Sequence, residues 1–346
     1  MTSDIILFLM QDGLTTGTVY VLLALALVMI FLVTRILFIP HGELVIFAAL
    51  TLAVLERGTV PATAWLAAGL GIVCAGADIL SGRRLGRLRA VLPMALLKAL
   101  VPAAVLLVLM ATAGSPLPQW VRIALTVLIV APLGPFLYQL VFVPIGRESV
   151  LVLMIVAMAL HLAMTGLGLA FFGPEGWRTA ALVPGTFTLG SLILPGQALV
   201  VFAIALAVAV GLYWFFDRTL TGKALRATAI NRRGAEIVGI DPVRAGEIAF
   251  LMGGVLAALS GIAVSPIMTL YYDSGLLLGL KGFTGAIVGG LAGYLPATIG
   301  ALFIGVSESA AAFWASSFKE VIVFTLILPV LLLRSLRTQI IEEHEE

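Results

Sequence analysis

Charged residues are scarce in this sequence of 346 residues. Asp, Glu, Lys and Arg make up 11% of it and hydrophobic residues 61%, whereas a soluble domain carries about 25% charged residues. The mean hydropathy is +1.16. So few charges cannot cover a water-facing surface, so the lipid bilayer must be the solvent for most of the chain. The composition excludes a disordered chain and leaves little room for a soluble catalytic domain.

Cysteine and histidine are also rare, and aromatic residues do not alternate with basic ones. Cys74 is the only cysteine and lies in an apolar run, which excludes a disulfide-stapled secreted module. His161, in AMALHLAMT, lacks the neighbours that a metal site needs, so we expect a packed hydrogen-bonding side chain. No stretch combines basic with interleaved aromatic residues, so nucleic-acid binding has no support. We predict neither a metal site nor a catalytic residue.

Long apolar runs dominate the chain instead. A spanning helix needs about 20 apolar residues, and runs bounded by charges, Gly and Pro predict eleven helices. Their ranges are 14–34, 42–56, 60–80, 91–113, 121–143, 150–172, 192–216, 246–271, 276–295, 296–315 and 320–334. The sequence therefore predicts an all-α polytopic membrane protein, with one transmembrane domain over residues 1–346.

The basic residues are distributed unevenly over the alternate loops. If residues 82–90 face the cytoplasm, 14 of the 20 Lys and Arg residues lie on that side and 4 lie outside. The cytoplasmic ones are Arg35, Arg83, Arg84, Arg87, Arg89, Arg147, Arg218, Lys223, Arg226, Arg232, Arg233, Arg244, Arg334 and Arg337, and the outer ones are Arg57, Arg122, Arg178 and Lys319. The positive-inside rule then predicts the N-terminus outside and the C-terminus inside.

Small residues recur at helical spacing near the C-terminus. They are Gly285, Gly289 and Gly293, followed by Ala297, Ala301 and Gly305. Helices in lipid associate through such residues because their backbones can approach closely. We therefore expect tight helix packing here, with a glycine-lined substrate path as the alternative.

The largest polar interruption lies between Asp217 and Glu247. It predicts two short helices, one following Gly222 and one over 234–238, with Gly239 in the C-terminal cap. Asp241 and Pro242 suit the N-cap and first residue of the next span. A basic loop of this kind contacts anionic lipid, while its Gly and Ala content favours docking of a soluble partner. It lacks the G-x-x-x-x-G-K-[ST] phosphate-binding string, so we do not expect ATP to bind this chain.

Ionisable residues inside apolar helices are costly and are functional candidates. Glu308, in GVSESAAAF, is expected either to form an interhelical hydrogen bond or to line a translocation path. Lys98 and Lys281 are near enough to helix ends to extend to the membrane surface. Lys281 is also expected within reach of Asp273.

The segment Phe38-Ile-Pro-His-Gly-Glu43 predicts a break between the first two helices. Pro40 lacks an N–H and Gly42 lacks a Cβ, so the helix can stop and restart at Glu43, whose carboxylate suits a helix N-terminus. A pivot at this break is a hypothesis. The candidates for a translocation path or helix break are Pro40, His41, Gly42, Glu43 and Glu308.

Three groups of residues carry a resemblance to a known family. They are Gly13-Leu-x-x-Gly17-x-x-Tyr20 with His41-Gly42-Glu43; Gly222-Lys-Ala-Leu-Arg226-Ala with Gly239-Ile240; and Gly289-Gly290-Leu-x-Gly293 with Gly300-Ala301, Glu308-Ser309 and Leu333-Arg334. On these residues the chain resembles the LivH/LivM family, the permease subunits of ABC importers for branched-chain amino acids and related amides. Phe38 and Pro40 stand where that family commonly has Asn and Ala, and residues 60–120 look like an added or strongly diverged helical pair.

The resemblance implies partners and a location. The partners are ABC ATPase subunits that bind ATP, a second permease subunit, homologous or identical, and an extracytoplasmic (periplasmic) substrate-binding protein, all at the plasma (inner) membrane of a bacterium or archaeon. No cofactor is expected in this chain. The residues expected to couple to the ATPase lie in the loop at 217–246 and are Gly222, Lys223, Arg226, Arg232, Arg233 and Gly239. The outer connection 172–190 is expected to touch the binding protein.

Two other functional classes stay open. A stand-alone secondary transporter or channel for a small solute would place coupling ions near broken helices, but the spans carry few carboxylates beyond Glu308. An integral-membrane enzyme would need a convergent acid, base or nucleophile set. His161, Ser307 and Glu308 are too far apart in sequence to define one.

Overall fold

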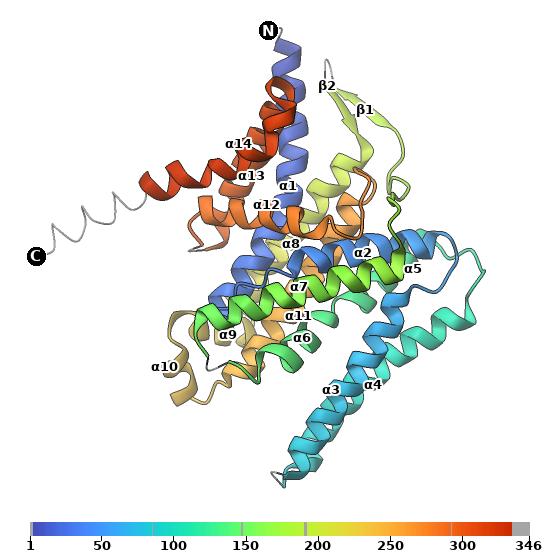
Figure 1. Cartoon of the computed structure of the whole chain (residues 1–346), viewed down its shortest axis with the longest axis vertical. Helices are drawn as coiled ribbons and strands as arrows, with labels where there is room; N and C mark the ends of the chain where they lie inside the picture. The colour runs from blue at the N-terminus through green and yellow to red at the C-terminus, as the bar shows by residue number, and fades with distance from the viewer. Residues whose placement is uncertain (1–2, 85, 147, 190–191, 292, 334–346) are drawn as a thin grey trace, which may run out of the picture.

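The computed structural model describes residues 3–84, 86–146, 148–189, 192–291 and 293–333 (Figure 1). Within them, helices dominate and one two-stranded hairpin is present. The helices are α1 (Ser3–Thr34), α2 (His41–Glu56), α3 (Ala62–Arg84), α4 (Leu88–Ala111), α5 (Gln119–Val130), α6 (Leu133–Leu137), α7 (Val150–Phe172), α8 (Gly196–Arg218), α9 (Leu220–Ile230), α10 (Arg232–Ile237), α11 (Pro242–Val264), α12 (Gly275–Val288), α13 (Tyr294–Trp314) and α14 (Lys319–Thr325). The strands are β1 (Thr186–Leu189) and β2 (Leu192–Pro195), while Tyr138–Phe142 is π-helical and Ser316–Phe318 is a 3-10 turn. The predicted all-α polytopic fold is confirmed.

Nine apolar helices in the described part of the chain are long enough to cross a membrane. They are Ile5–Thr34, Ala62–Arg84, Leu88–Ala111, Gln119–Phe142, Val150–Phe172, Gly196–Arg218, Pro242–Val264, Tyr294–Trp314 and Ser316–Leu333. The other two predicted runs form α2 and α12, of 16 and 14 residues. At 1.5 Å per residue these helices are about 24 and 21 Å long, less than the roughly 30 Å of a bilayer core.

Helices α2 and α12 lie within the body of the molecule. In α2, 14 of the 16 residues are buried, and its neighbours are α5, α7, α11 and α12. Figure 1 shows both helices running across the view at a steep angle to α1. Each follows a non-helical stretch, 35–40 before α2 and 265–274 before α12. Helix α11 ends at Val264 and α12 ends at Val288, so the predicted spans 246–271 and 276–295 are too long at their C-terminal ends.

Small residues bring α1, α12 and α13 into close contact. A Cβ on Gly285 would overlap Ala301 of α13, and a Cβ on Gly305 would overlap the backbone of Gly17 in α1. The absence of side chains lets these backbones touch, which is a source of packing energy in lipid. The predicted tight packing is confirmed at these positions.

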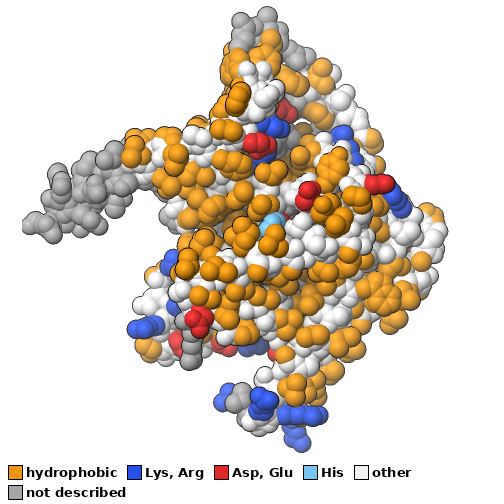
Figure 2. Space-filling model, viewed as in Figure 1, with side chains coloured by type: hydrophobic (Ala, Val, Ile, Leu, Met, Phe, Trp, Pro, Cys, Tyr) orange, Lys and Arg blue, Asp and Glu red, His pale blue; other side chains and the backbone are white. Residues whose placement is uncertain are grey.

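The α3–α4 hairpin extends away from the other helices (Figure 1). Leu97, Leu100 and Leu107 on α4 are more than half exposed, as expected for side chains that face lipid. The tip of the hairpin carries Arg83, Arg84, Arg87 and Arg89. Figure 2 shows apolar side chains over most of this face of the molecule and basic ones gathered at its lower end. The hairpin occupies the region predicted as a helical pair.

The basic segments lie toward one end of the molecule. In Figure 1 the α3–α4 tip and the α9–α10 segment are in the lower part, while the start of α1 and the β1–β2 hairpin are in the upper part. This arrangement agrees with the predicted orientation, which itself stays a prediction. Three basic residues of the predicted cytoplasmic set, Arg147, Arg334 and Arg337, lie outside the described residues.

The β1–β2 hairpin is a departure from the predicted helix over 192–216. Thr186 pairs with Pro195 and Phe187 with Leu194 in an antiparallel register, and α8 begins only at Gly196. Two short runs of apolar and β-branched residues around a Gly-Ser pair are typical of a hairpin, so the sequence did contain the signal. Gly190, the end of the predicted outer connection, lies outside the described residues.

Candidate functional site

The segment between α8 and α11 folds as two short helices, as predicted. The N-cap residues Thr219, Asn231 and Asp241 each accept a hydrogen bond from a backbone N–H two or three residues further on. Such caps satisfy N–H groups that a helix start leaves free. After α10, Gly239 has a φ of +86°, the left-handed conformation that glycine favours. The predicted caps at Gly239 and Asp241 are both confirmed.

Helix α9 is packed directly onto the end of α8. The sequence predicted that this helix follows Gly222, but the helix starts at Leu220. Gly222 therefore lies in its first turn. A Cβ on Gly222 would overlap the backbone of Phe215 and Phe216. Glycine is therefore needed here for contact between α8 and α9.

The exposed surface of α9 and α10 combines apolar and basic side chains. Leu220, Ile230, Ile237 and Val238 are 87%, 80%, 86% and 74% exposed. Four of the predicted coupling residues are exposed around them, namely Lys223, Arg226, Arg232 and Arg233. Arg226 is within 4.0 Å of Asp217, an exposed pair. Exposed apolar residues rimmed by polar ones are typical of a protein-binding surface, which we call the α9–α10 surface.

The backbone breaks between α1 and α2 at the predicted place. Helix α1 ends at Thr34, Arg35 has a φ of 60°, and Pro40 is the N-cap residue of α2. Helix α2 starts at His41, one residue before the predicted range 42–56 and two before the predicted restart at Glu43. A Cβ on Gly42 would overlap the carbonyl of Gly275 at the start of α12. The break therefore brings the N-terminal ends of α2 and α12 into contact.

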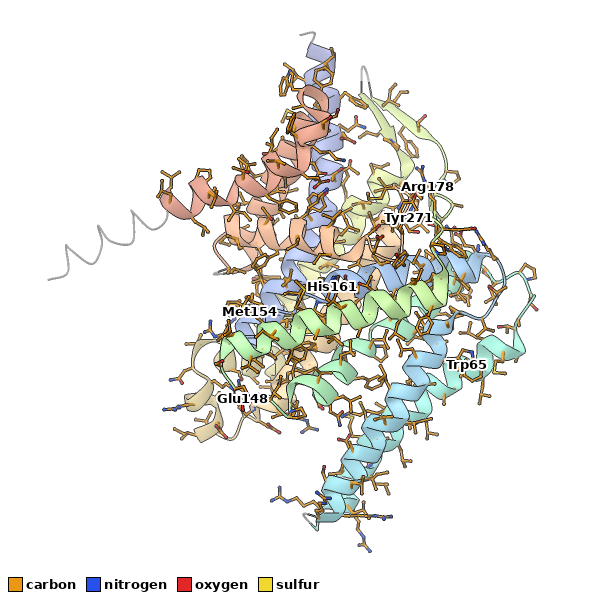
Figure 3. All side chains as sticks on the ribbon, viewed as in Figure 1. Trp65, Glu148, Met154, His161, Arg178 and Tyr271 are labelled. Atoms are coloured by element: carbon orange, nitrogen blue, oxygen red, sulfur yellow. The ribbon has the colours of Figure 1, made fainter. Side chains whose placement is uncertain are left out.

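Glu43 and His161 form a buried pair next to this contact. Glu43 Oε1 and His161 Nδ1 are 2.7 Å apart, and the two side chains are 1% and 7% exposed. Figure 3 shows His161 in the middle of α7, at the centre of the molecule. The predicted hydrogen-bonding role of His161 is confirmed. Its partner was not predicted, because 118 residues separate the two in sequence.

Two polar groups beside this pair have no partner among the described residues. They are the ring nitrogens of His41, which is 0% exposed, and Glu43 Oε2. A buried polar atom without a hydrogen bond costs about 1–3 kcal/mol. Such atoms in a well-packed interior therefore mark a candidate functional position.

Glu308 lies in a second buried cluster. Its carboxylate accepts hydrogen bonds from Tyr20 Oη and Lys281 Nζ, each at 2.6 Å, and Lys281 also donates to Glu320 at 3.1 Å. The predicted interhelical hydrogen bond is confirmed, whereas the predicted approach of Lys281 to Asp273 is wrong. Lys281 is 8% exposed, so it does not extend to the membrane surface.

Lys98 lies in a third, half-buried ionic cluster. Its Nζ lies 3.0 Å from Asp78, 3.1 Å from Glu247 and 2.7 Å from Oε1 of Gln139. The expected extension of Lys98 to the membrane surface is therefore wrong, because three polar partners meet it within the protein. Gln139 lies in the π-helical segment, and Glu247 in α11. The cluster attaches the α3–α4 hairpin to the helix that follows the α9–α10 surface.

The predicted site residues thus occupy three places. Gly222, Lys223, Arg226, Arg232, Arg233 and Gly239 lie in the α9–α10 segment; Pro40, His41, Gly42 and Glu43 lie at the break; Glu308 lies in the Lys281 cluster. Among the described residues, no hydrogen bond or ion pair joins the predicted site residues of one place to those of another, although Arg35 of the break donates a hydrogen bond to the carbonyl of Ala229 in α9. Nor do three His, Cys, Asp or Glu side chains gather in that part of the chain in a way that could hold a metal ion.

The outer connection after α7 is packed onto the connection between α11 and α12. Trp177 and Leu270 exchange two backbone hydrogen bonds, and the guanidinium of Arg57 lies 3.8 Å from the ring centre of Trp177. Arg178 donates to the carbonyls of Pro266 and Ile267. These contacts therefore hold the outer connection against the rest of the protein.

Residues 91–332 match the family model described as the permease component of branched-chain amino acid transport systems. The chain belongs to this family. The permease is 25% identical over 239 residues to the high-affinity branched-chain amino acid transport permease BraD of Pseudomonas aeruginosa, covering 67% of this chain and 78% of BraD. It is 24% identical over 213 residues to LivH of Escherichia coli, covering 60% of this chain and 69% of LivH. A probable LivH of Methanocaldococcus jannaschii is 31% identical over 114 residues, 33% of this chain and 36% of the relative.

No solved structure matches the permease significantly. The family match starts within α4, so it includes the α9–α10 surface, His161, Lys281 and Glu308. Helices α1 to α3, with His41 to Glu43, precede it. The predicted LivH/LivM membership is confirmed, and the N-terminal part of the resemblance stays a prediction.

Proposed function

We propose that this permease is one membrane subunit of an ABC importer that moves branched-chain amino acids, or a related small amino acid or amide, into the cell. ATP is hydrolysed on partner ATPase subunits. The observation that carries the proposal is the α9–α10 surface, exposed and both apolar and basic, in a member of the branched-chain amino acid permease family. The chain offers a docking surface and lacks the phosphate-binding string. This combination suits a subunit that is driven by ATP hydrolysis on another subunit.

Two routes lead from the α9–α10 surface to the helix break. One is direct, because Arg35 Nη2 donates to the carbonyl of Ala229 at the end of α9, at 3.2 Å. The other runs through Asp241 into α11, which packs along α1 and α2. A displacement of α9 and α10 by an ATPase is therefore transmitted to both sides of the break.

The break is the proposed moving part. Pro40 and Gly42 allow α2 to change its angle to α1, and the Glu43–His161 pair links α2 to α7. Because the His41 ring nitrogens and Glu43 Oε2 lack hydrogen-bond partners among the described residues, this region can form new hydrogen bonds in a second conformation at little cost. We place the translocation path, or its gate, at Pro40 to Glu43, and Glu308 at a fixed contact between helices beside it.

The partners follow from the same proposal. They are ABC ATPases at the α9–α10 surface, a second permease subunit, identical or homologous, and an extracytoplasmic binding protein at the surface around Trp177. The setting is the plasma membrane of a bacterium or archaeon, since relatives occur in both. Membrane lipid covers the exposed leucines of α4.

The test is ATP-driven uptake. The permease, its second permease subunit, the ATPases and the binding protein are reconstituted in proteoliposomes, and uptake of labelled leucine is measured with ATP or a non-hydrolysable analogue on the ATPase side. We expect co-purification with the ATPase and uptake only with ATP. Proton-driven uptake by the purified chain alone would contradict the proposal and favour a secondary transporter.

A further inference from the structure

A cavity of about 580 Å³ lies between α1, the β1–β2 hairpin, the start of α8 and the α11–α12 connection. Its volume is within the range of small-molecule sites, roughly 300–1,000 Å³. Phe8, Ile193 and Ile267 supply apolar parts of its wall, while Asp12 and Arg178 supply opposite charges. Arg178 lies below the β1–β2 hairpin in Figure 3, at the end predicted to face outward.

The two charged side chains do not neutralise each other. Neither Asp12 nor Arg178 forms an ion pair with any described residue. Arg178 is held in place by hydrogen bonds from Nε to Pro266 O at 3.1 Å and from Nη2 to Ile267 O at 3.0 Å. Since those bonds use one edge of the guanidinium, the edge with Nη1 remains available for a carboxylate, which Arg binds with two parallel bonds.

Asp12 is the second charged residue that lines the cavity, and it is held by a hydrogen bond from α13. Its Oδ2 accepts a hydrogen bond from Ser309 Oγ of α13 at 2.8 Å, and its Oδ1 has no described partner. A carboxylate with a free acceptor atom suits an ammonium group. The cavity thus offers an acceptor for a cation and a donor edge for an anion, both anchored to the protein.

We propose that this cavity binds a free amino acid with an aliphatic side chain, as a zwitterion, on its way into the permease. The ammonium group contacts Asp12, the carboxylate contacts Arg178, and the side chain packs against Phe8, Ile193 and Ile267. The inference rests on the proposed function and deepens it, because it selects an amino acid over an amide. A neutral amide leaves both charges of the cavity without an ionic partner, and a ligand with a single charge leaves one.

The bound amino acid would connect parts of the permease that belong to different helices. Asp12 lies on α1 and is linked to α13, while Arg178 is fixed to the segment that precedes α12. A ligand that contacts both therefore holds α1 and the α11–α12 connection at a fixed separation. This connection leads into α12, whose first residue Gly275 contacts Gly42 at the helix break.

The test is equilibrium binding to the full-length permease in lipid nanodiscs, without binding protein or ATPase. Labelled L-leucine is the probe, and the competitors are isoamylamine, 4-methylpentanoate and 4-methylpentanamide, which lack the carboxylate, the ammonium or both charges. Since a hydrogen bond to a charged group contributes about 1.5–3 kcal/mol, we expect each competitor to be at least about tenfold weaker than leucine. Asp12→Asn and Arg178→Lys should weaken leucine binding similarly. Glu175→Gln, an exposed charge on the same outer connection, should not.

A further variant fills the cavity and keeps both charges. Ile193 is 58% exposed on β2, so Ile193→Trp can be accommodated without repacking a core, and it should reduce leucine binding. Absence of leucine binding, equal competition by 4-methylpentanamide, or wild-type binding by Asp12→Asn would each overturn the inference. ATP-driven uptake measured in parallel separates the two claims. Uptake without binding to the permease contradicts the cavity assignment alone, while binding without uptake contradicts the importer proposal alone.

Discussion

Lys281, Glu308 and Lys98 are charged side chains within apolar helices, and each contacts an opposite charge on another helix. An unpaired buried charge is far more costly than a paired one. The sequence identified these residues individually because charge in an apolar run is conspicuous. It could not supply their partners, since Lys281 and Glu308 are 27 residues apart and Lys98 and Glu247 are 149 apart.

Removing Lys281 alone should destabilise the permease strongly. Lys281→Met leaves the buried Glu308 without its cation, and breaking a buried pair costs about 3–5 kcal/mol. The double variant Lys281→Met with Glu308→Gln should recover part of this loss. Thermal unfolding in detergent, followed by fluorescence, measures both. Lys319→Met is the control, because that lysine is 43% exposed and 4.0 Å from Glu320; an equal loss there would contradict the role of burial.

The Glu43–His161 pair should matter for transport more than for insertion. Glu43→Gln removes the charge but keeps the size, and we expect ATP-driven leucine uptake to fall at least about tenfold, as for loss of a charged hydrogen bond. Uptake is normalised to the amount of permease in the proteoliposomes. Met154→Leu, seven residues before His161 on the same helix, is the control (Figure 3). Normal uptake by Glu43→Gln would exclude the pair from the path.

At the scale of helices, the sequence identified each apolar run but not the direction in which the resulting helix lies in the protein. Hydropathy measures how apolar a segment is, so α2 and α12 were predicted as spans although they are 16 and 14 residues long. The helix break was predictable because its signals are local: Pro40 fixes φ and lacks an N–H, and Gly42 lacks a Cβ. Strand β2 was missed because Leu192–Pro195 is as apolar as the helix that follows, so it was assigned to that helix.

Gly42→Ala should disturb the contact between α2 and α12. The added Cβ meets the backbone of Gly275, which cannot move aside as a flexible side chain would, and such overpacking costs about 1–3 kcal/mol. A lower unfolding temperature is therefore expected. In the matched control, Gly166→Ala in α7, the Cβ meets nothing within 4 Å, so stability should be unchanged or slightly higher. Equal effects of the two substitutions would refute the close approach at Gly42.

Replacing two arginines of the α9–α10 surface should uncouple the permease from its ATPase. Arg226→Gln with Arg232→Gln removes exposed charges, and the only ion pair lost among the described residues is the exposed one between Arg226 and Asp217, so insertion and unfolding temperature should be nearly unchanged. Co-purification with the ATPase and ATP-driven uptake should both be lost. Arg89→Gln at the α3–α4 tip is the control for loss of an exposed basic residue. Unchanged uptake by the double variant would mean that these arginines do not couple the subunits.

For the whole molecule, the lone cysteine permits a direct test of orientation. Cys74 is buried, so Cys74→Ala gives a background without reactive thiols. Ser81→Cys lies at the basic tip of the α3–α4 hairpin, and Ser115→Cys lies in the exposed connection between α4 and α5. A membrane-impermeant maleimide should label Ser115→Cys on intact cells and Ser81→Cys only after permeabilisation. The reverse pattern would place the N-terminus inside.

The half-buried cluster around Lys98 has a consequence for the membrane itself. Through Glu247 it fastens two lipid-exposed helices to α11, the helix that directly follows the α9–α10 surface. If α11 tilts when the ATPases close, the α3–α4 hairpin must move with it and displace the lipids along its length. The viscosity of the bilayer would then resist each transport cycle, so turnover should depend on the lipid in which the permease is placed.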